Sequence, residues 1–485
     1  MKDKWHMPHP ATMFLLLTLV VIFLSWIFDI YGMSVVQPQT GEEIRVLNLL
    51  SPEGIRWLLR HVVTNFTGFA PLGLVIVAMF GIGVAQHSGF IDACIRKSWR
   101  KQQPKPGRII LGVILVGLLS NVVGDAGYII LLPIAATLFL SVGLHPLAGI
   151  ITAYVSVSCG YSANLLLSTL DPMLAATTQE AVNFHDIASV NTGPLCNYYF
   201  FFASALVIAC IIYYITRRSL LPAVGEYKEE NAFSGYKPLS RKERRAIMTA
   251  VIVGLVYVVV VLFATFSSWG ILRGVNGGLI RSPFMTGILF LISFGIGLMG
   301  MVYGFASGHY RTDGDVINGF TQPMKLLGVY FVITFFASQM FACLEYTHLD
   351  KCIAIMGADV LSSIRMDSLW ILLLFILFTA LINLIMVSAT SKWAFMSFIF
   401  IPVLAAKGIS PDMVQCAYRI GDSATNAITP FMFYMPLVLT YMQQYDKQTT
   451  YGTLLKYSWK YSLSILVAWM VLFIFWYVSG LSLGL

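Results

Sequence analysis

The chain has little charge for its length and no long polar segment. Of its 485 residues only 11% are charged, whereas 58% are hydrophobic and 14% aromatic, and the mean hydropathy is +0.77. So few charged residues cannot supply the polar surface of a soluble protein of this size. The composition predicts a polytopic membrane protein. The longest polar loop, Arg217 to Arg245, is too short to bury a core, so we expect a single transmembrane domain over residues 1–485.

Several classes of site are missing from the sequence. The seven cysteines form no CxxC pair and no His-spaced metal pattern, and Cys159, Cys210 and Cys416 lie inside apolar runs. We therefore expect buried, reduced thiols, with no metal site and no disulfide framework. The chain has no Walker motif and no HExxH sequence, which argues against direct use of ATP and against a membrane zinc protease.

An intramembrane aspartyl protease is a further alternative, because Gly-Asp pairs occur at Asp125 and Asp422. The GxGD pattern of such enzymes fails at both places. Val122 and Arg419 stand where the first glycine is required. We therefore expect no enzymatic activity.

The net charge of +8 comes mainly from two loops, Arg96 to Arg108 and Arg217 to Arg245. Basic loops of membrane proteins stay on the cytoplasmic side, so this charge predicts topology rather than binding of nucleic acid. The N-terminal lysines before the apolar run Thr12 to Tyr31 resemble a signal peptide. That run is close to the ~20 residues of a spanning helix and no cleavage pattern follows it, so we expect a helix.

Seven apolar stretches are long enough for full crossings of the bilayer. We expect them at about Thr12 to Tyr31, Gly68 to Ala85, Asn197 to Ile215, Ile247 to Phe266, Phe284 to Tyr303, Leu326 to Glu345 and Tyr461 to Ser479.

Between the two basic loops the number of crossings must be even. The count is satisfied if Ile109 to Val142 is a re-entrant hairpin with the polar tip Ser120 to Asp125. Pro146 then opens a crossing that is broken at Ser162, Ala163 and Asn164. The second half has the same order, with a hairpin from Ser368 to Lys407.

The tip of that second hairpin is Ser388 to Lys392, and Pro411 opens a second broken crossing. The two halves enter from opposite sides, which predicts inverted repeats over 109–216 and 326–482, with 217–245 a cytoplasmic loop. The predicted fold is all-α and polytopic, with nine transmembrane helices and two re-entrant hairpins. The N-terminus is expected inside and the C-terminus outside.

Two short segments resemble each other at the predicted breaks, Gly160-Tyr161-Ser162-Ala163-Asn164 and Gly421-Asp422-Ser423-Ala424-Thr425-Asn426. Small and polar residues that interrupt helices at matching places in two halves form the midplane site of many secondary transporters. Irregular backbone at that depth is tolerated only where protein or a water-filled cavity satisfies it. The pairing therefore indicates a transporter.

Charged side chains at membrane depth cost about 2.5 to 3.5 kcal/mol each, which makes each one a candidate for function. They are few: Asp125, Asp171, Lys392, Arg419 and Asp422. Arg419 and Asp422 are three residues apart, so they share a helix face and are close enough to pair. Such a pair would fix the broken helix; alternatively Arg419 binds a substrate carboxylate and Asp422 takes the coupling proton or cation.

The other candidates each have a structural alternative. Asp171 either serves the site or caps the chain before Pro172, and Lys392 either serves the site or snorkels from the hairpin tip. Trp393 either stacks on an aromatic ligand or packs in the protein. Polar side chains suited to a cation or a carboxylate, or else to hydrogen bonds between helices, are Asn121, Ser162, Asn164, Ser423 and Asn426.

These residues resemble the AbgT family of p-aminobenzoyl-glutamate transporters and antimetabolite exporters, nearly from end to end. The resemblance is densest at Phe69-Ala70-Pro71-Leu72-Gly73, Ser162-Ala163-Asn164-Leu165-Leu166, Leu170-Asp171, Lys392-Trp393 and Arg419-Ile420-Gly421-Asp422-Ser423, continuing through Asn426, Ile428, Thr429 and Pro430. It implies nine spanning helices with two hairpins, a homodimer, and an aqueous cavity. The residues that it places in this cavity are Asp171, Trp393, Pro411, Arg419, Asp422 and Pro430. One position departs from the family pattern, since Thr390 stands where a serine is expected.

The resemblance and the site residues together predict a secondary transporter of aromatic dicarboxylates of the p-aminobenzoyl-glutamate type, with sulfonamide export as a further activity. The alternative within transport is a sodium-coupled dicarboxylate symporter. We expect a bacterial inner-membrane protein whose partners are a small-molecule substrate, the lipid bilayer and a second copy of the chain, and not nucleic acid. No cofactor is expected beyond the coupling ion, H⁺ or Na⁺, with any Na⁺ near Asn164 and Asn426.

Overall fold

The computed structural model describes residues 8–37, 40–98, 105–163, 165–187, 192–227, 239–267, 269–274, 282–362 and 366–485. Within these ranges the chain is almost entirely helical. The elements of the first half are α1 (Pro10–Ile30), β1 (Ser34–Val36), β2 (Glu43–Arg45), α2 (Pro52–Thr67), α3 (Ala70–His87), α4 (Phe90–Ser98), α5 (Pro106–Ser120), η1 (Asn121–Val123), α6 (Ala126–Ser141), α7 (Pro146–Cys159), α8 (Leu170–Phe184), α9 (Tyr198–Ile215), η2 (Thr216–Leu220) and α10 (Leu221–Val224).

The second half contains helices throughout its described residues. They are α11 (Arg241–Phe266), α12 (Pro283–Ser307), α13 (Asp313–Thr347), α14 (Leu349–Ser362), α15 (Ser368–Asn383), α16 (Ala389–Ala405), α17 (Pro411–Ala424), α18 (Met435–Gln443) and α19 (Tyr451–Ser479). The short strands β1 and β2 pair antiparallel, with Val35 opposite Ile44.

Seven helical segments within the described residues are long and apolar enough to cross a membrane. They are Pro10–Ile30, Pro52–His87, Tyr198–Val224, Arg241–Phe266, Pro283–Ser307, Leu327–Thr347 and Tyr451–Ser479. Each overlaps one of the seven full spans that the sequence predicts, so the chain is a polytopic membrane protein. The apolar side chains that α11 leaves exposed, such as Leu255 and Val259, suit contact with lipid.

Helix α2 was not expected from the sequence. This helix starts at Pro52 after a Ser51 cap and leads through a break at Gly68 into α3. Its charged residues Glu53, Arg56 and Arg60 interrupt the apolar pattern, so hydropathy alone placed the start of this span at Gly68.

Prolines define the starts of the helices that surround the two breaks. Pro106, Pro146 and Pro411 each occupy the first turn of a helix, where the missing N–H would have no partner anyway. From Pro106 and from Ser368 the order is the same: two helices that form a hairpin, a buried 14-residue helix, an irregular segment, a short helix and a long helix.

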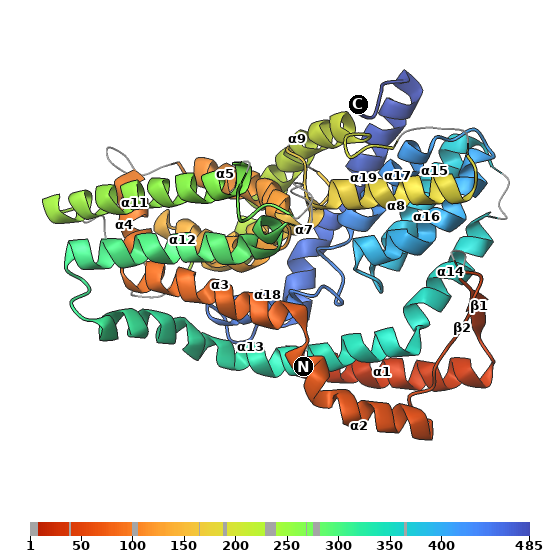
Figure 1. The fold of residues 1–485 in the computed structure, drawn as a ribbon, viewed down its shortest axis with the longest axis horizontal. Helices are drawn as coiled ribbons and strands as arrows, with labels where there is room; N and C mark the ends of the chain where they lie inside the picture. Colours follow the sequence, from red (N-terminus) through yellow and green to blue (C-terminus); the bar gives the residue numbers. More distant parts are fainter. Residues whose placement is uncertain are drawn as a thin grey trace.

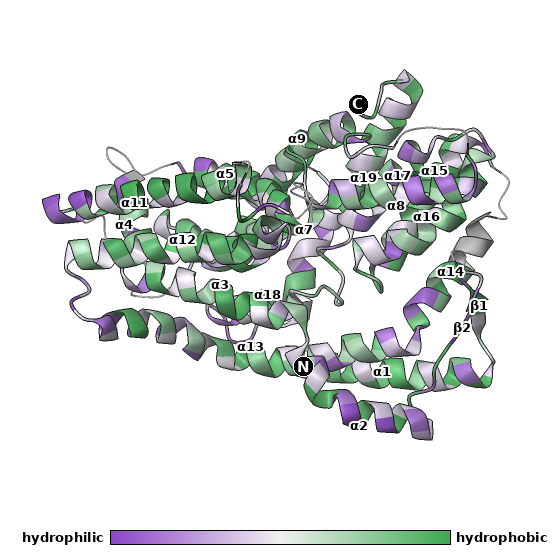
Figure 2. Cartoon of the chain, in the orientation of Figure 1, coloured by the Kyte–Doolittle hydropathy of each residue, from purple (hydrophilic) through white to green (hydrophobic). Residues whose placement is uncertain are grey.

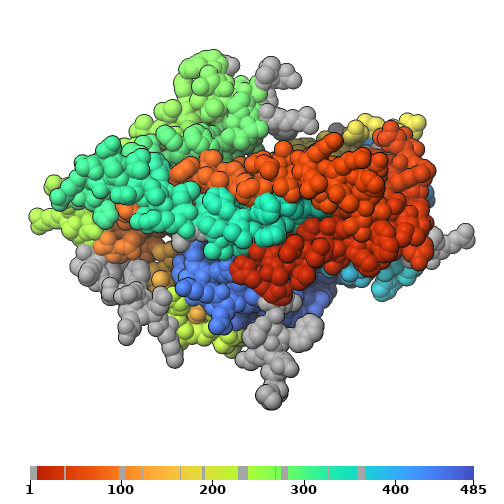
Figure 3. Space-filling view, turned by 90° about the horizontal axis from the view of Figure 1, so that it is seen from below, coloured from red at the N-terminus to blue at the C-terminus, as the bar shows by residue number. Residues whose placement is uncertain are grey.

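Figure 1 shows two groups of helices joined by α13. One group contains α3, α11 and α12, which pack side by side. The other contains α8, α15, α16 and α17, and α13 runs beneath both groups to reach α1. Hydrophobic residues cover most of α5, α11 and α12, and hydrophilic residues gather at helix ends (Figure 2). From below, α1, α2, α3 and α13 cover much of the molecule (Figure 3).

The two broken helices correspond to each other in a register that differs from the sequence motifs. Both α7 and α17 have 14 residues and start with proline, so Ser158 corresponds to Ser423 and Val157 to Asp422. Matching contacts support this register, because Asn121 Nδ2 donates to Val157 O and Asn383 Nδ2 donates to Asp422 O. The sequence motifs pair Ser162 with Ser423 instead, which is displaced by one helical turn.

Candidate functional site

The C-terminal ends of α7 and α17 meet in the interior of the protein. Ser423 Oγ donates to Ser162 Oγ at 2.7 Å, and Tyr154 OH donates to the backbone O of Asn426 at 3.2 Å. Asn426 Nδ2 donates in turn to the backbone O of Ser158 at 3.4 Å. The two breaks are therefore in direct contact, and each has a backbone carbonyl that accepts a hydrogen bond from the other half.

Arg419 lies beside this junction and pairs with a residue from the first half of the chain. Arg419 Nη2 is 2.6 Å from Asp171 Oδ1. Asp171 belongs to the first turn of α8, and its Oδ2 accepts from Ser168 N at 2.6 Å and from Ser168 Oγ at 2.9 Å. The Ser168 contacts hold the Asp171 carboxylate in place, and this carboxylate in turn holds one end of the Arg419 guanidinium.

The rest of the Arg419 guanidinium has few polar contacts. It lies 4.1 Å from the centroid of the Phe201 ring, and only 3% of Arg419 is exposed. Nε and Nη2 find no well-aligned hydrogen-bond acceptor among the described residues, so the close approach to Asp171 is an ion pair with poor hydrogen-bond angles. A buried guanidinium with unused donors favours binding of a planar anion such as a carboxylate.

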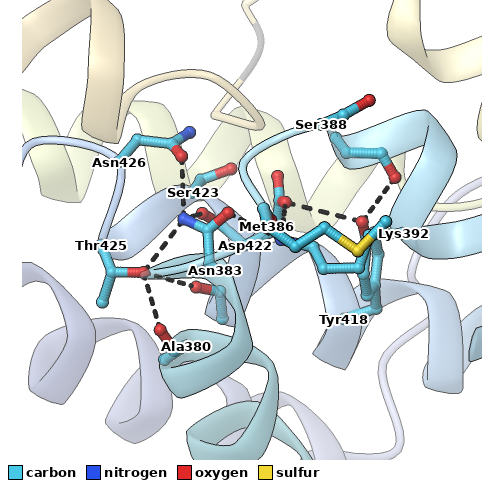
Figure 4. A network of polar contacts seen from close by, with 12 residues as sticks. Ala380, Asn383, Met386, Ser388, Lys392, Tyr418, Asp422, Ser423, Thr425 and Asn426 are labelled. Carbon is cyan, nitrogen blue, oxygen red and sulfur yellow. Dashed lines mark hydrogen bonds and ion pairs between the residues drawn. The ribbon is translucent and has the colours of Figure 1, made fainter. Parts of the chain in front are cut away.

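A second buried ion pair joins α16 to α17 (Figure 4). Lys392 Nζ is 2.8 Å from Asp422 Oδ1, and it also donates to Asn383 Oδ1 at 2.6 Å and to Met386 O at 3.0 Å. Tyr418 OH donates to Ala389 O at 2.5 Å and approaches Asp422 Oδ1 at 3.5 Å. Lys392 is completely buried and Asp422 is 1% exposed.

Asn383 connects this ion pair to the second break. Its Nδ2 faces three oxygens, at 2.6 Å from Asp422 O, 3.1 Å from Thr425 Oγ1 and 2.8 Å from Asn426 Oδ1. The side-chain oxygen of Asn426, where we expected a bound Na⁺, therefore accepts a hydrogen bond from the end of α15.

Trp393 packs inside the protein. Its ring centroid is 4.5 Å from that of Tyr418, with 33° between the planes, and its Nε1 donates to Thr178 Oγ1 at 2.9 Å. Thr178 also accepts from Gln415 Nε2 at 3.1 Å. The exposed fraction of Trp393 is 0%, so its ring packs on Tyr418 in this conformation.

The structure bears on three of the alternatives raised for these residues. Arg419 and Asp422 do not pair with each other, because Asp171 from α8 pairs with Arg419 and Lys392 from α16 pairs with Asp422. Lys392 does not snorkel to the surface, since its side chain is completely buried. Protein packing covers Asp171, Trp393, Arg419 and Asp422, each at most 5% exposed, so these four do not line an open cavity here.

The remaining predicted residues belong to the hairpins and to the broken crossings. Asn121 is buried in η1 and donates to the backbone of α5 and α7. Thr390 lies in the first turn of α16, Pro411 starts α17, and Pro430 lies between α17 and α18. Asn164 lies outside the described residues. Cys210 is exposed, contrary to expectation, although all seven cysteines are unpaired.

A cavity of about 470 Å³, lined by both apolar and polar side chains, borders the other side of the second hairpin tip. Met386, Ser388 and Ser391 line it from the hairpin, and Glu345 and Asp350 line it from α13 and α14. Since Met386 O also accepts from Lys392, the hairpin tip separates this cavity from the buried ion pair.

Sequence reasoning missed Asn383, Tyr418, Phe201 and Thr178. Asn383 had a usable signal, because it is an amide at the end of an apolar 16-residue helix. The other three are ordinary in sequence, and only the packing of α8, α9, α16 and α17 shows their role.

Comparison with known proteins gives matches over nearly the whole chain. The model of a family described as "AbgT putative transporter family" matches residues 4–485. The p-aminobenzoyl-glutamate transport protein of Escherichia coli K12 is 29% identical over 478 residues, which cover 98% of this chain and 93% of that protein.

Two solved structures are similar in sequence and in fold. The YdaH transporter of Alcanivorax borkumensis is 35% identical with a TM-score of 0.54, covering 99% of this chain and 100% of YdaH. MtrF of Neisseria gonorrhoeae, which represents a class of antimetabolite efflux pumps, is 36% identical with a TM-score of 0.52, covering 97% of this chain and 95% of MtrF.

Proposed function

The chain belongs to the AbgT family of transporters, and from this premise we propose that it moves aromatic dicarboxylates of the p-aminobenzoyl-glutamate type across the bacterial inner membrane. A proton or cation gradient drives this transport, and sulfonamides are a further substrate class. The curated relative is named for transport of p-aminobenzoyl-glutamate. The protein is a transporter and not an enzyme.

Arg419 is the observation that best supports a carboxylate substrate. Its guanidinium is buried, held by Asp171 from one side only, and Nε has no acceptor among the described residues. A substrate carboxylate that displaces Asp171 or binds beside it would satisfy these donors. Hydrogen bonds to such charged groups contribute about 1.5 to 3 kcal/mol each.

The charge balance of the site supports coupling to a cation. Asp171 pairs with Arg419 and Asp422 pairs with Lys392, so these four charges sum to zero. A dicarboxylate adds two negative charges at a depth where each unpaired charge costs about 2.5 to 3.5 kcal/mol. Simultaneous uptake of protons or cations removes this cost, which links substrate binding to the ion gradient.

The aromatic part of the substrate would bind near Trp393 and Tyr418. These rings pack against each other at a tilt of 33° in the described conformation, and a movement of α16 relative to α17 would open the space between them for a ligand ring. Offset stacking of aromatic rings contributes about 0.5 to 1.5 kcal/mol. The carboxylate therefore contributes most of the binding free energy, and the ring makes a smaller contribution.

We further propose the membrane arrangement. The hairpins α5–α6 and α15–α16 are re-entrant, and the crossings broken after α7 and α17 complete nine spanning helices. Inverted repeats extend over 109–216 and 326–482, and the transporter works as a homodimer. The repeated order of helices supports this arrangement.

The competing function is a sodium-coupled symporter of aliphatic dicarboxylates, which would use Arg419 in the same way. Uptake of labelled p-aminobenzoyl-glutamate into proteoliposomes, under separately imposed H⁺ and Na⁺ gradients, distinguishes the two. We expect unlabelled p-aminobenzoyl-glutamate to compete for uptake better than succinate does. Trp393→Ala should reduce the difference in competition between the two ligands. Stronger competition by succinate in the wild-type protein would support the symporter instead.

A further inference from the structure

We propose that the ammonium group of Lys392 occupies a monovalent-cation site beside the second break, so that Asp422 is neutralised by a cation of the chain itself and not by Na⁺. This inference rests on the contacts of Lys392 and is independent of the proposed substrate.

The surroundings of the ammonium group have the composition of a cation site. Three oxygens of different kinds converge on Nζ: Asp422 Oδ1 at 2.8 Å, Asn383 Oδ1 at 2.6 Å and Met386 O at 3.0 Å. A carboxylate, an amide oxygen and a backbone carbonyl are also the oxygen ligands that hard metal cations take in proteins. Lys392 is completely buried, so the group has exchanged its water for these oxygens.

The orientation of the Asn383 amide is set by its other contacts. Nδ2 faces oxygens of Asp422, Thr425 and Asn426, which require a donor at that end of the amide. The oxygen of Asn383 must then face the cation position. The second break and the end of α15 therefore build this position, and Lys392 fills it.

The first half of the chain shows that the architecture does not require a lysine. Asn121 corresponds to Asn383, since it joins the first hairpin to α7 through the same kind of backbone contact. Its Oδ1 is buried and has no hydrogen-bond partner among the described residues. The first hairpin thus packs on its broken helix without a cationic side chain at this oxygen, so Lys392 is an addition specific to the second half.

Removal of the ammonium group should open the site to an inorganic cation. In Lys392→Ala the carboxylate of Asp422 loses its partner while the three oxygens remain around an empty space, and an unpaired buried charge is strongly unfavourable. A small cation can restore the balance. Lys392→Met also removes the charge, but its side chain is almost as long as lysine and fills the space.

The test is the melting temperature of the purified full-length protein in detergent, in NaCl against choline chloride at equal ionic strength. For Lys392→Ala we expect a saturable Na⁺-dependent rise of several degrees. Lys392→Met and the double variant Lys392→Ala/Asp422→Asn should not show this rise, because one fills the space and the other lacks the carboxylate. Lys407→Ala removes a lysine from the end of the same hairpin and should respond to Na⁺ like the wild type.

The wild-type protein provides a test that does not depend on folding of the Lys392 variants. We expect any Na⁺-dependent shift in the melting temperature of the wild type to persist unchanged in Asp422→Asn, because Lys392 already occupies the cation position. A wild-type Na⁺ shift that Asp422→Asn abolishes would overturn the proposal, as would a Na⁺ response in Lys392→Ala no larger than that of the wild type. Neither measurement uses transport, so failure of the proposed substrate would leave this result intact.

Discussion

Arg419 has two roles to separate, because the same side chain forms a buried ion pair and presents unused donors. If Arg419 only stabilises the fold, removal of Asp171 together with Arg419 should restore transport. If Arg419 binds substrate, transport should stay lost even when Asp171 is also removed. The pair with Asp171 makes this difference measurable.

We predict that Arg419→Ala weakens binding of p-aminobenzoyl-glutamate and of succinate by at least about tenfold, because one charge-assisted hydrogen bond contributes about 1.5 to 3 kcal/mol. The control is Asp171→Asn/Arg419→Ala, which removes both charges and so avoids an unpaired buried carboxylate. We expect this double variant to recover thermal stability but not transport, measured by melting temperature and proteoliposome flux. Recovery of transport would show that the pair is structural.

At this scale the sequence indicated which charged residues lie in the interior but not how they pair. The rarity of charge in apolar runs identified Asp171, Lys392, Arg419 and Asp422. Spacing along one helix suggested that Arg419 and Asp422 pair, whereas each finds its partner on another helix. Partners from α8 and α16 depend on helix packing, which periodicity within α17 does not contain.

At the scale of elements, close packing of α15 against α17 holds the second break in position. A Cβ atom at Gly421 would lie 2.4 Å from the backbone O of Ile376 and 2.8 Å from Thr379 Cβ. The two helices therefore approach closely at this glycine, one residue before Asp422. Backbone atoms of α15 cannot move away without moving the helix that carries Asn383.

We predict that Gly421→Ala lowers the stability of the protein by about 1 to 3 kcal/mol, since overpacking outweighs the gain in helix propensity. It should also reduce transport, because it displaces Asn383 from Asp422. Gly112→Ala in α5 is the matched control, as no atom lies within 4 Å of its added Cβ. An unchanged melting temperature for Gly421→Ala would contradict the close approach.

The order of elements could be predicted because prolines and polar tips are local signals. Pro146 and Pro411 open the two broken helices as expected. The register between the repeats could not be read from similar residues. Ser162 and Ser423 contact each other across the junction, but they do not occupy equivalent positions in the two halves. Equal helix length and matching amide contacts, which need coordinates, give the register instead.

At the scale of the whole molecule, hydropathy predicted the seven apolar spans but not the helical residues that precede some of them. Charged residues prevented the prediction of α2, and α13 begins at Asp313, well before the predicted span at Leu326. Side-chain burial also differs between individual helices. All 14 residues of α7 are buried, whereas α11 leaves much of its apolar surface exposed, so the site lies in the protein interior and the lipid contacts lie elsewhere.

The orientation of the first repeat determines whether the two repeats are inverted. If α5–α6 is re-entrant, its two ends lie on the cytoplasmic side and the chain crosses the membrane through α7 and α8 before α9 returns. If the hairpin instead crossed the bilayer twice, its two ends would still share a side. The side reached after α8 is therefore the informative position, and Asn183 at the end of α8 is exposed for labelling.

We predict that, in a variant without the seven native cysteines, a cysteine at Lys105 is labelled by a membrane-impermeant maleimide only from the cytoplasmic side. A cysteine at Asn183 should be labelled only from outside, because the broken crossing carries the chain across once. The basic loop around Lys105 sets the first orientation, and the parity of crossings sets the second. Labelling of both positions from the same side would mean that α7 and α8 do not cross the membrane together, and the repeats would then have the same orientation.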